Sequence, residues 1–369
     1  MKKKVLFIFL IIFILFPVVI MGFDLSAASA ALYEPVSGRF LFEKSKDVKM
    51  GIASTTKILT AITAIENGNP ADVVITSKSA SEIEGSSIWL EEGEEQTLEN
   101  LLYGLMLASG NDASVAIAEH IGKDVENFAI LMNQTAKRSG ADQSNFVNPS
   151  GLDHESHYAT AADLAKIMAY AEKNPLFRTI TSTKQYEIPW KGHPYNRVIH
   201  NHNKLLTLYE GCSGGKTGFT KKSGRCLVSS ATRDGIHLIA VTLNAPDDWN
   251  DHIKLMDYGF SILQRKDLLQ ENLTAEDYVV KNGEKNFVKT SYKNTVSIPV
   301  LDSDCVTFKT IWSKNNTAPI EKGAVVGYRE FYLNGEMIMK ADIVSKESCD
   351  VKIVPKLQDF LLMLFGQLF

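Results

Sequence analysis

The sequence predicts an α+β protein: an antiparallel five-stranded sheet flanked by helices, followed by a small all-β domain and a C-terminal amphipathic helix. Strand-like segments at both ends of the first 270 residues enclose a long helical middle. That order favours one antiparallel sheet with helices packed on its faces. Beyond residue 270, short β-like runs alternate with Asn, Gly and Lys turns, which indicates a separate β domain.

The N-terminal segment predicts export. The basic residues Lys2–Lys4 precede an almost wholly apolar run over 5–23, and Ala28-Ser29-Ala30 supplies a small-x-small cleavage site. This order is typical of a signal peptide over 1–30 that is cut before Ala31. A retained membrane anchor is the alternative, because the apolar run is long enough to span a bilayer. Both interpretations place the rest of the chain outside the cytoplasmic membrane.

The first domain is expected over 31–268. It opens with a hairpin, continues through the helical middle, and returns to strands in an antiparallel meander. The hairpin contributes two strands and the meander three, which gives the five strands of the sheet. The expected strands are 31–34, 39–43, 213–219, 225–232 and 236–243, and the clearest helices are near 54–67, 98–107, 112–121, 124–139, 160–173 and 249–263.

A small β-sandwich is expected over 272–350, and an amphipathic helix over 352–369. The terminal segment is too short to span a membrane, but an apolar helix face can lie in the membrane interface. The alternative is a terminal helix that packs on the domain core. The large apolar residues that share one helical face are Leu357, Phe360, Leu361, Leu364, Leu368 and Phe369.

The charge balance and the cysteines exclude some classes of partner. The net charge of −4 becomes more negative when the lysine-rich leader is removed, so no nucleic-acid partner is expected. Export permits disulfides among Cys212, Cys226, Cys305 and Cys349. One disulfide in each domain and four free thiols are the two alternatives. His200 and His202 alternate on a strand-like segment, but no zinc spacing is present, so no metal or cofactor is expected.

The segment Ser54-Thr55-Thr56-Lys57 lies at the start of a predicted helix. Residues three apart share one helix face, so the Ser54 hydroxyl and the Lys57 ammonium can come within hydrogen-bond reach. A serine becomes a nucleophile when a base takes its proton. Lysine can be that base if burial and a second ammonium lower its pKa, and Lys216 is the natural second cation. Taken alone, the segment also fits an ordinary amphipathic helix.

Two further segments can complete such a site. Ser109-Gly110-Asn111 follows an apolar helix, and the corner at Gly110 can aim the Ser109 hydroxyl and the Asn111 amide into a cleft. There Ser109 could relay a proton, while Asn111 holds a substrate amide or positions Lys57. A plain helix–turn–helix corner is the alternative.

Lys216-Thr217-Gly218 follows two glycines on a predicted strand. The glycines let another backbone approach closely, so a peptide can add to this strand through main-chain hydrogen bonds. Thr217 and Lys216 are then placed to bind a carboxylate. A glycine-rich strand edge without a function is the alternative for this segment alone.

The three motifs SxxK, SxN and KTG, in this order, resemble the triad of penicillin-interacting serine peptidases and serine β-lactamases. The surrounding sequence from about residue 31 to 264 closely resembles the low-molecular-mass penicillin-binding D-alanyl-D-alanine carboxypeptidases. The small β domain and the tail resemble the C-terminal half of that family. The stretch KTGFTKKSGRCLVSSA resembles the branch from endospore-forming Gram-positive bacteria, which adds sporulation to the expected settings.

The resemblance implies a fold, an activity and a location. The fold is that of DD-peptidases and serine β-lactamases. The enzyme removes the terminal D-alanine from peptidoglycan stem peptides that end in D-Ala-D-Ala, through an acyl-enzyme on Ser54, and β-lactams acylate the same serine. Such an exported enzyme lies at the outer face of the cell membrane, attached by its C-terminal helix, and serves cell wall biogenesis and cell shape.

The resemblance also assigns roles to individual residues. Ser54 is the nucleophile, Lys57 the general base and Ser109 the proton relay. The backbone N–H groups of Ser54 and Phe219 form the oxyanion hole. The expected substrate-binding residues are Asn111, Lys216, Thr217, Gly218 and Phe219.

Two departures from the family pattern stand out. Phe219 occupies a position where several members carry histidine, which affects substrate fit more than main-chain donation. Some members place an arginine after the last sheet strand to hold the substrate carboxylate, and here 246–251 contains none. Binding of the substrate carboxylate is therefore expected to depend more on Thr217 and Lys216.

Two other functions remain open. A serine β-lactamase would turn over penicillin rapidly, whereas a peptidase would stay acylated. A catalytically silent penicillin-binding wall scaffold would release no D-alanine from a D-Ala-D-Ala peptide.

Overall fold

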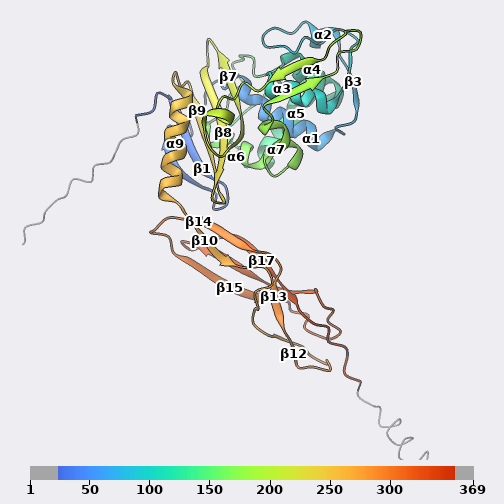
Figure 1. Cartoon of the computed structure of the whole chain (residues 1–369), viewed down its shortest axis with the longest axis vertical. Helices are drawn as coiled ribbons and strands as arrows, with labels where there is room; N and C mark the ends of the chain where they lie inside the picture. Colours follow the sequence, from blue (N-terminus) through green and yellow to red (C-terminus); the bar gives the residue numbers. More distant parts are fainter. Residues whose placement is uncertain (1–23, 354–369) are drawn as a thin grey trace, which may run out of the picture.

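The computed structural model describes residues 24–353, which form a helix-covered sheet domain and an elongated β domain (Figure 1). The predicted signal segment up to residue 23 and residues 354–369 of the predicted terminal helix lie outside the described residues. Within 24–353, no helix is both long and apolar enough to cross a membrane.

The first domain is built on the predicted five-stranded antiparallel sheet. Its strand order is β2-β1-β9-β8-β7, so the hairpin and the meander join through β1 and β9, and β7 is an edge strand. The strands are β1 (Ser29–Glu34), β2 (Arg39–Lys44), β7 (Cys212–Thr220), β8 (Gly224–Arg233) and β9 (Ile236–Leu243).

Helices cover both faces of this sheet, and α9 lies on the face opposite the main helical group (Figure 1). The alternation of side chains along β9 explains the two layers. Ile239 and Val241 enter the larger core with the main helical group, whereas Leu238 and Ala240 pack in the core that contains Leu255 of α9. The helices are α1 (Lys57–Asn67), α2 (Lys78–Ser81), α3 (Leu98–Leu107), α4 (Asn111–Gly122), α5 (Val125–Arg138), α6 (Ala161–Ala171), α7 (Pro175–Ser182), α8 (Leu205–Leu208) and α9 (Asp248–Ile262).

Two small two-stranded sheets complete the first domain. Strand β3 (Val73–Ile75) pairs with β4 (Glu95–Thr97), and β5 (Gln185–Ile188) pairs with β6 (Arg197–His200). Neither of them belongs to the central sheet.

Residues just before Ala31 already pack against the first domain in the structure. Strand β1 starts at Ser29, so the predicted cut before Ala31 falls inside it. Leu25 and Ala27 are buried, and the backbone N–H of Ala27 donates to the Asp251 carboxylate at 2.9 Å. Small residues suit both a cleavage site and a tightly packed strand, so the cut before Ala31 stays a prediction.

The second domain is all-β, as predicted. Three small sheets share one core, in which Tyr292, Phe331 and Ile343 are buried. Its strands are β10 (Gln264–Leu269), β11 (Tyr278–Val279), β12 (Phe287–Val288), β13 (Thr290–Tyr292), β14 (Val296–Val300), β15 (Val306–Trp312), β16 (Val325–Leu333) and β17 (Glu336–Ser345). Arg39 of β2 reaches across from the first domain, and its Nη1 donates to Asp304 Oδ2 at 2.6 Å.

All four cysteines lie within the described residues, and all are free thiols in the structure. Cys212 and Cys226 lie on adjacent strands but out of register, because Cys212 faces Ala231 and Cys226 faces Gly218.

Candidate active site

Ser54 lies in a short 3-10 helix, Ala53–Thr56, that leads directly into α1. Ala53 has φ +46°, a left-handed conformation that non-glycine residues rarely adopt, and such strain clusters at functional sites. Strand β7 passes close to this turn. A Cβ on Gly218 would lie only 2.9 Å from Ser54 N. The glycine therefore lets the SxxK and KTG segments meet.

The Lys57 amine makes three contacts with oxygen atoms. Its Nζ lies 3.0 Å from Ser54 Oγ, 2.7 Å from Asn111 Oδ1 and 2.7 Å from the Ser150 carbonyl oxygen. The Asn111 amide is oriented by its Nδ2, which donates to the Glu84 carbonyl at 2.6 Å. Asn111 Oδ1 and the Ser150 carbonyl can only accept hydrogen bonds. A neutral Lys57 amine would donate its two N–H groups to them and direct its lone pair at the Ser54 hydroxyl.

The surroundings of Lys57 favour that neutral form. Lys57 is completely buried, and this burial lowers its pKa well below 10.5. The nearby Lys216 ammonium lowers the Lys57 pKa further, and Asp112 acts in the opposite direction. Burial also lowers the pKa of Lys216 to about 7. Both lysines can therefore lose a proton far more easily than a lysine in water.

Ser109 lies at the corner between α3 and α4, with φ +63°. It lines the same cavity of about 320 Å³ as Ser54, Thr217, Gly218 and Phe219. No hydrogen bond joins the Ser109 and Ser54 hydroxyls in the described chain. Lys216 is nearly buried, and its Nζ donates to the Thr217 carbonyl at 2.9 Å. The three motifs thus gather at one cavity, and the direct hydrogen bonds among them link Ser54, Lys57 and Asn111.

Strand β7 contributes Thr217, Gly218 and Phe219 to the wall of this cavity. It is the edge of the five-stranded sheet, and an edge strand leaves backbone N–H and C=O groups available for another chain. Phe219 lies near its end, and its side chain is exposed. A peptide placed beside β7 could therefore extend the sheet and bring a carbonyl to Ser54.

A loop that sequence analysis gave no role supplies one of the Lys57 partners. Ser150 presents its carbonyl to Lys57, and the following Gly151 has φ +85°. A Cβ on Gly151 would lie 2.0 Å from the Ala53 carbonyl oxygen, so only glycine lets the loop pack this closely. The Asn-Pro-Ser-Gly sequence at 148–151 signals a turn, but nothing in it predicts contact with Lys57.

Three more residues on the cavity wall were also missed. Arg225 of β8, together with Asp248 and Trp249 at the start of α9, lies beside Thr217 and Phe219. His202, considered above as a metal ligand, is on the same wall, and its pKa is lowered by burial and by Lys216. Among residues 24–353 there is no group of three or more His, Cys, Asp or Glu side chains that could hold a metal ion.

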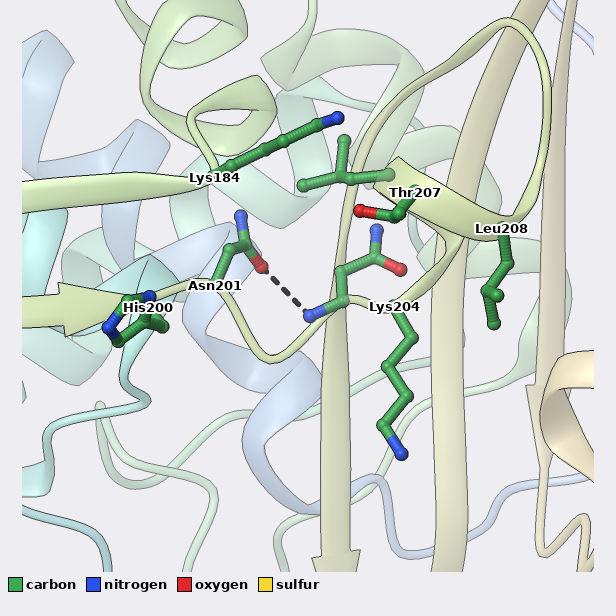
Figure 2. A pocket seen from close by; sticks show the side chains of 8 residues that line it. Lys184, His200, Asn201, Lys204, Thr207 and Leu208 are labelled. Atoms are coloured by element: carbon green, nitrogen blue, oxygen red, sulfur yellow. Dashed lines mark hydrogen bonds between the residues drawn. The ribbon is translucent and has the colours of Figure 1, made fainter.

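A larger cavity of about 430 Å³ lies beside 200–208 and contains none of the predicted site residues (Figure 2). The Asn201 side chain lines this cavity and is hydrogen-bonded within its own loop. Asn201 Oδ1 accepts from the backbone N–H of Asn203 at 2.9 Å. Lys184, Lys204 and Thr207 also line this cavity, but within the described residues no hydrogen bond joins either lysine amine to the Thr207 hydroxyl.

Two family models match this chain. The model for D-alanyl-D-alanine carboxypeptidases of peptidase family S11 matches residues 18–247, and that for the C-terminal domain of penicillin-binding protein 5 matches 264–350. The chain is 34% identical to the D-alanyl-D-alanine carboxypeptidase DacF of Bacillus subtilis, over 87% of this chain and 85% of that protein. It is 29% identical to DacC of Escherichia coli, over 94% and 90%.

Solved structures agree with these matches. Penicillin-binding protein 5 from Haemophilus influenzae superposes with a TM-score of 0.67 at 28% identity, covering 89% of this chain and 98% of that structure. A D-alanyl-D-alanine carboxypeptidase from Mycobacterium tuberculosis gives a TM-score of 0.62 at 30% identity, covering 65% and 92%. The first structure extends over both domains.

Proposed function

The chain belongs to the D-alanyl-D-alanine carboxypeptidase family of peptidases, and on this premise we propose how its own residues carry out the reaction. The enzyme is a hydrolase that removes the terminal D-alanine from peptidoglycan stem peptides, and like its family it binds β-lactams. The observation that carries the proposal is the hydrogen bonding of Lys57. Two acceptors hold its amine, and the third direction faces Ser54 Oγ at 3.0 Å.

The first step forms the acyl-enzyme. Neutral Lys57 takes the proton of the Ser54 hydroxyl while Oγ attacks the carbonyl between the two D-alanines. The new Oγ–C bond places a negative charge on the carbonyl oxygen. The backbone N–H groups of Ser54 and Phe219 stabilise this charge. The contact of β7 with the turn at Ser54 supports their convergence.

The second step releases D-alanine and restores the serine. The C–N bond breaks, and the proton held by Lys57 passes through Ser109 to the leaving amine. Water then attacks the ester carbonyl, Lys57 accepts a proton from that water, and the proton returns to Ser54 as the shortened peptide leaves. Substrate binding in this scheme falls to Asn111, Thr217 and Gly218 with Lys216. The position of Thr217 and Gly218 on the cavity wall, the contact of Asn111 with Lys57 and the edge position of β7 support that role.

Release of D-alanine from diacetyl-Lys-D-Ala-D-Ala tests this proposal. The wild type should release one D-alanine per peptide, and Ser54→Ala should release none while keeping the wild-type circular dichroism spectrum. Undiminished release by Ser54→Ala would remove Ser54 from its role. A wild type that is folded and binds penicillin, yet releases no D-alanine, would favour the silent scaffold.

The second domain favours a peptidase over a β-lactamase. It is matched by the model for the C-terminal domain of penicillin-binding protein 5. A persistent adduct after brief penicillin treatment is the expected result for the peptidase. Rapid turnover of penicillin would favour the β-lactamase.

We also propose that the enzyme acts outside the cytoplasmic membrane, at its outer face. The substrate class supports this, because peptidoglycan is extracytoplasmic. The basic and apolar leader supports export, and the apolar face predicted for 352–369 supports attachment through a C-terminal helix. Fractionation of cells that express the full chain and a chain ending at residue 353 tests the attachment. Equal membrane fractions for the two chains would contradict it.

A further inference from the structure

The cavity at Ser54 contains a permanent positive charge that the mechanism above does not use. Among the residues that line it, Arg225 and Asp248 carry the formal charges. Arg225 lies on β8 directly opposite Phe219 of β7, so it is one strand behind the site where a peptide would add.

Two residues at the start of α9 contact the guanidinium of Arg225. Its Nη2 donates to Asp248 Oδ1 at 2.8 Å, and its centre lies 6.0 Å from the ring centroid of Trp249. Asp248 is almost fully buried, with 4% of its side chain exposed, whereas 43% of the Arg225 side chain is exposed. An arginine has five N–H donors, and this contact uses only Nη2. Within residues 24–353 the Arg225 side chain forms no other hydrogen bond, so its remaining N–H groups can donate to an anion in the cavity.

The two lysines of the site are poorly suited to the same task. Lys57 must be neutral to act as the base, and burial lowers the pKa of Lys216 to about 7. Arginine stays charged at every physiological pH and can grip a carboxylate with two parallel hydrogen bonds. The product of the reaction, like the substrate, carries a carboxylate next to the bond that is cut.

We propose that Arg225, together with Thr217, binds the terminal carboxylate of the substrate and selects peptides with a free C-terminus. Arg225 thereby replaces the arginine that some family members place after the last sheet strand and that is missing from 246–251 here. Asp248 fixes the direction of the guanidinium, and Trp249 limits its movement. This inference rests on the carboxypeptidase function proposed above.

The experiment compares a D-Ala-D-Ala peptide that has a free carboxylate with the same peptide as its C-terminal amide. For Arg225→Leu, kcat/KM for the free acid should fall about 10- to 100-fold, as expected for the loss of a hydrogen bond to a charged group. Hydrolysis of the amide should stay close to the wild-type rate. Arg225→Lys should retain part of the preference for the acid, because it keeps the charge but not the paired donors.

Arg233→Leu is the matched control, because Arg233 ends the same strand and contacts Asp257 instead of the cavity. It should leave the ratio of acid to amide hydrolysis unchanged. Retained amide hydrolysis by Arg225→Leu shows that this variant is folded. An equal loss for acid and amide, or an unchanged ratio, would overturn the assignment of Arg225. Failure of the wild type to release D-alanine from the acid and D-alaninamide from the amide would instead overturn the carboxypeptidase function.

Discussion

The two lysines of the candidate site differ from the paired lysines of the second domain in their exposure and in their partners. In the first domain, Lys57 and Lys216 are buried, with 0% and 1% exposure, and neither forms an ion pair within the described chain. In the second domain, Lys285 and Lys340 are about half exposed and pair with Glu347 and Glu330. Exposed pairs contribute little to stability, whereas an unpaired buried charge is costly, so a buried lysine tends to lose its proton. The difference locates the chemistry in the first domain.

Removing the buried amine should have the largest effect. Lys57→Met leaves Ser54 without a base, so the rate of acylation by penicillin should fall about 10²- to 10⁴-fold. The exposed Lys78→Met serves as the control and should acylate at the wild-type rate. Fluorescent-penicillin labelling over time measures both. If Lys57→Met were acylated as fast as the control, this buried lysine would have no role in acylation.

Two glycines with the same backbone conformation, one in each domain, can each be replaced by alanine and compared. Gly151 and Gly323 both have φ +85°, so alanine at either position carries a backbone cost of about 1–2 kcal/mol. At Gly323 no atom lies within 4 Å of a new Cβ, whereas at Gly151 the Ala53 carbonyl would lie at 2.0 Å. Gly151→Ala should therefore lower the melting temperature more and also slow acylation, because the Ser150 carbonyl shifts away from Lys57. Equal effects on both measurements would contradict close packing at the site.

Replacing Lys216 should raise the stability of the protein and shift the pH dependence of its acylation. Below pH 7 the buried ammonium of Lys216 opposes protonation of Lys57, so Lys216→Met should raise the pKa of Lys57 and move the acid limb of the acylation profile to higher pH. The pKa of Lys216 is lower in the folded than in the unfolded state, so its proton favours unfolding below about pH 10.5 and most strongly below pH 7. The melting temperature of Lys216→Met should therefore rise, and most at acid pH. An unshifted acid limb would show that the two lysines are not coupled.

The smallest effect is expected in the second domain. Lys340→Gln removes one exposed pair with Glu330, so activity should be unchanged and the melting temperature should stay within about 1 °C of the wild type. Calorimetry and D-alanine release measure these quantities. A clear loss of either would mean that surface charges of the β domain act on the catalytic domain.

Local sequence was enough to predict most of the fold, and its motifs singled out residues that the structure brings together. Turn residues and hydrophobic periodicity marked the five strands of the sheet, and the three motifs identified Ser54, Lys57 and Asn111, which are joined by hydrogen bonds in the structure. The contacts that the sequence did not reveal join distant segments. The Ser150 carbonyl is 93 positions from Lys57, and it acts through its backbone, so its side chain gives no signal.

Arg225 was missed for a related reason. Arginine was sought after the last sheet strand, whereas the structure supplies one from β8, beside β7. Which side chains of neighbouring strands reach the same cavity depends on register and on the position of α9. Neither can be read from spacing alone. The start of β1 shows the same limit, since its small residues also fit a cleavage site.

Mapping the residue that penicillin acylates shows whether Ser54 is the nucleophile. The full-length protein is treated with penicillin, digested, and examined by mass spectrometry. We expect one adduct, of one penicillin per chain, on the peptide that contains Ser54, and none in Ser54→Ala. An adduct on any other residue, or an adduct that persists in Ser54→Ala, would contradict it.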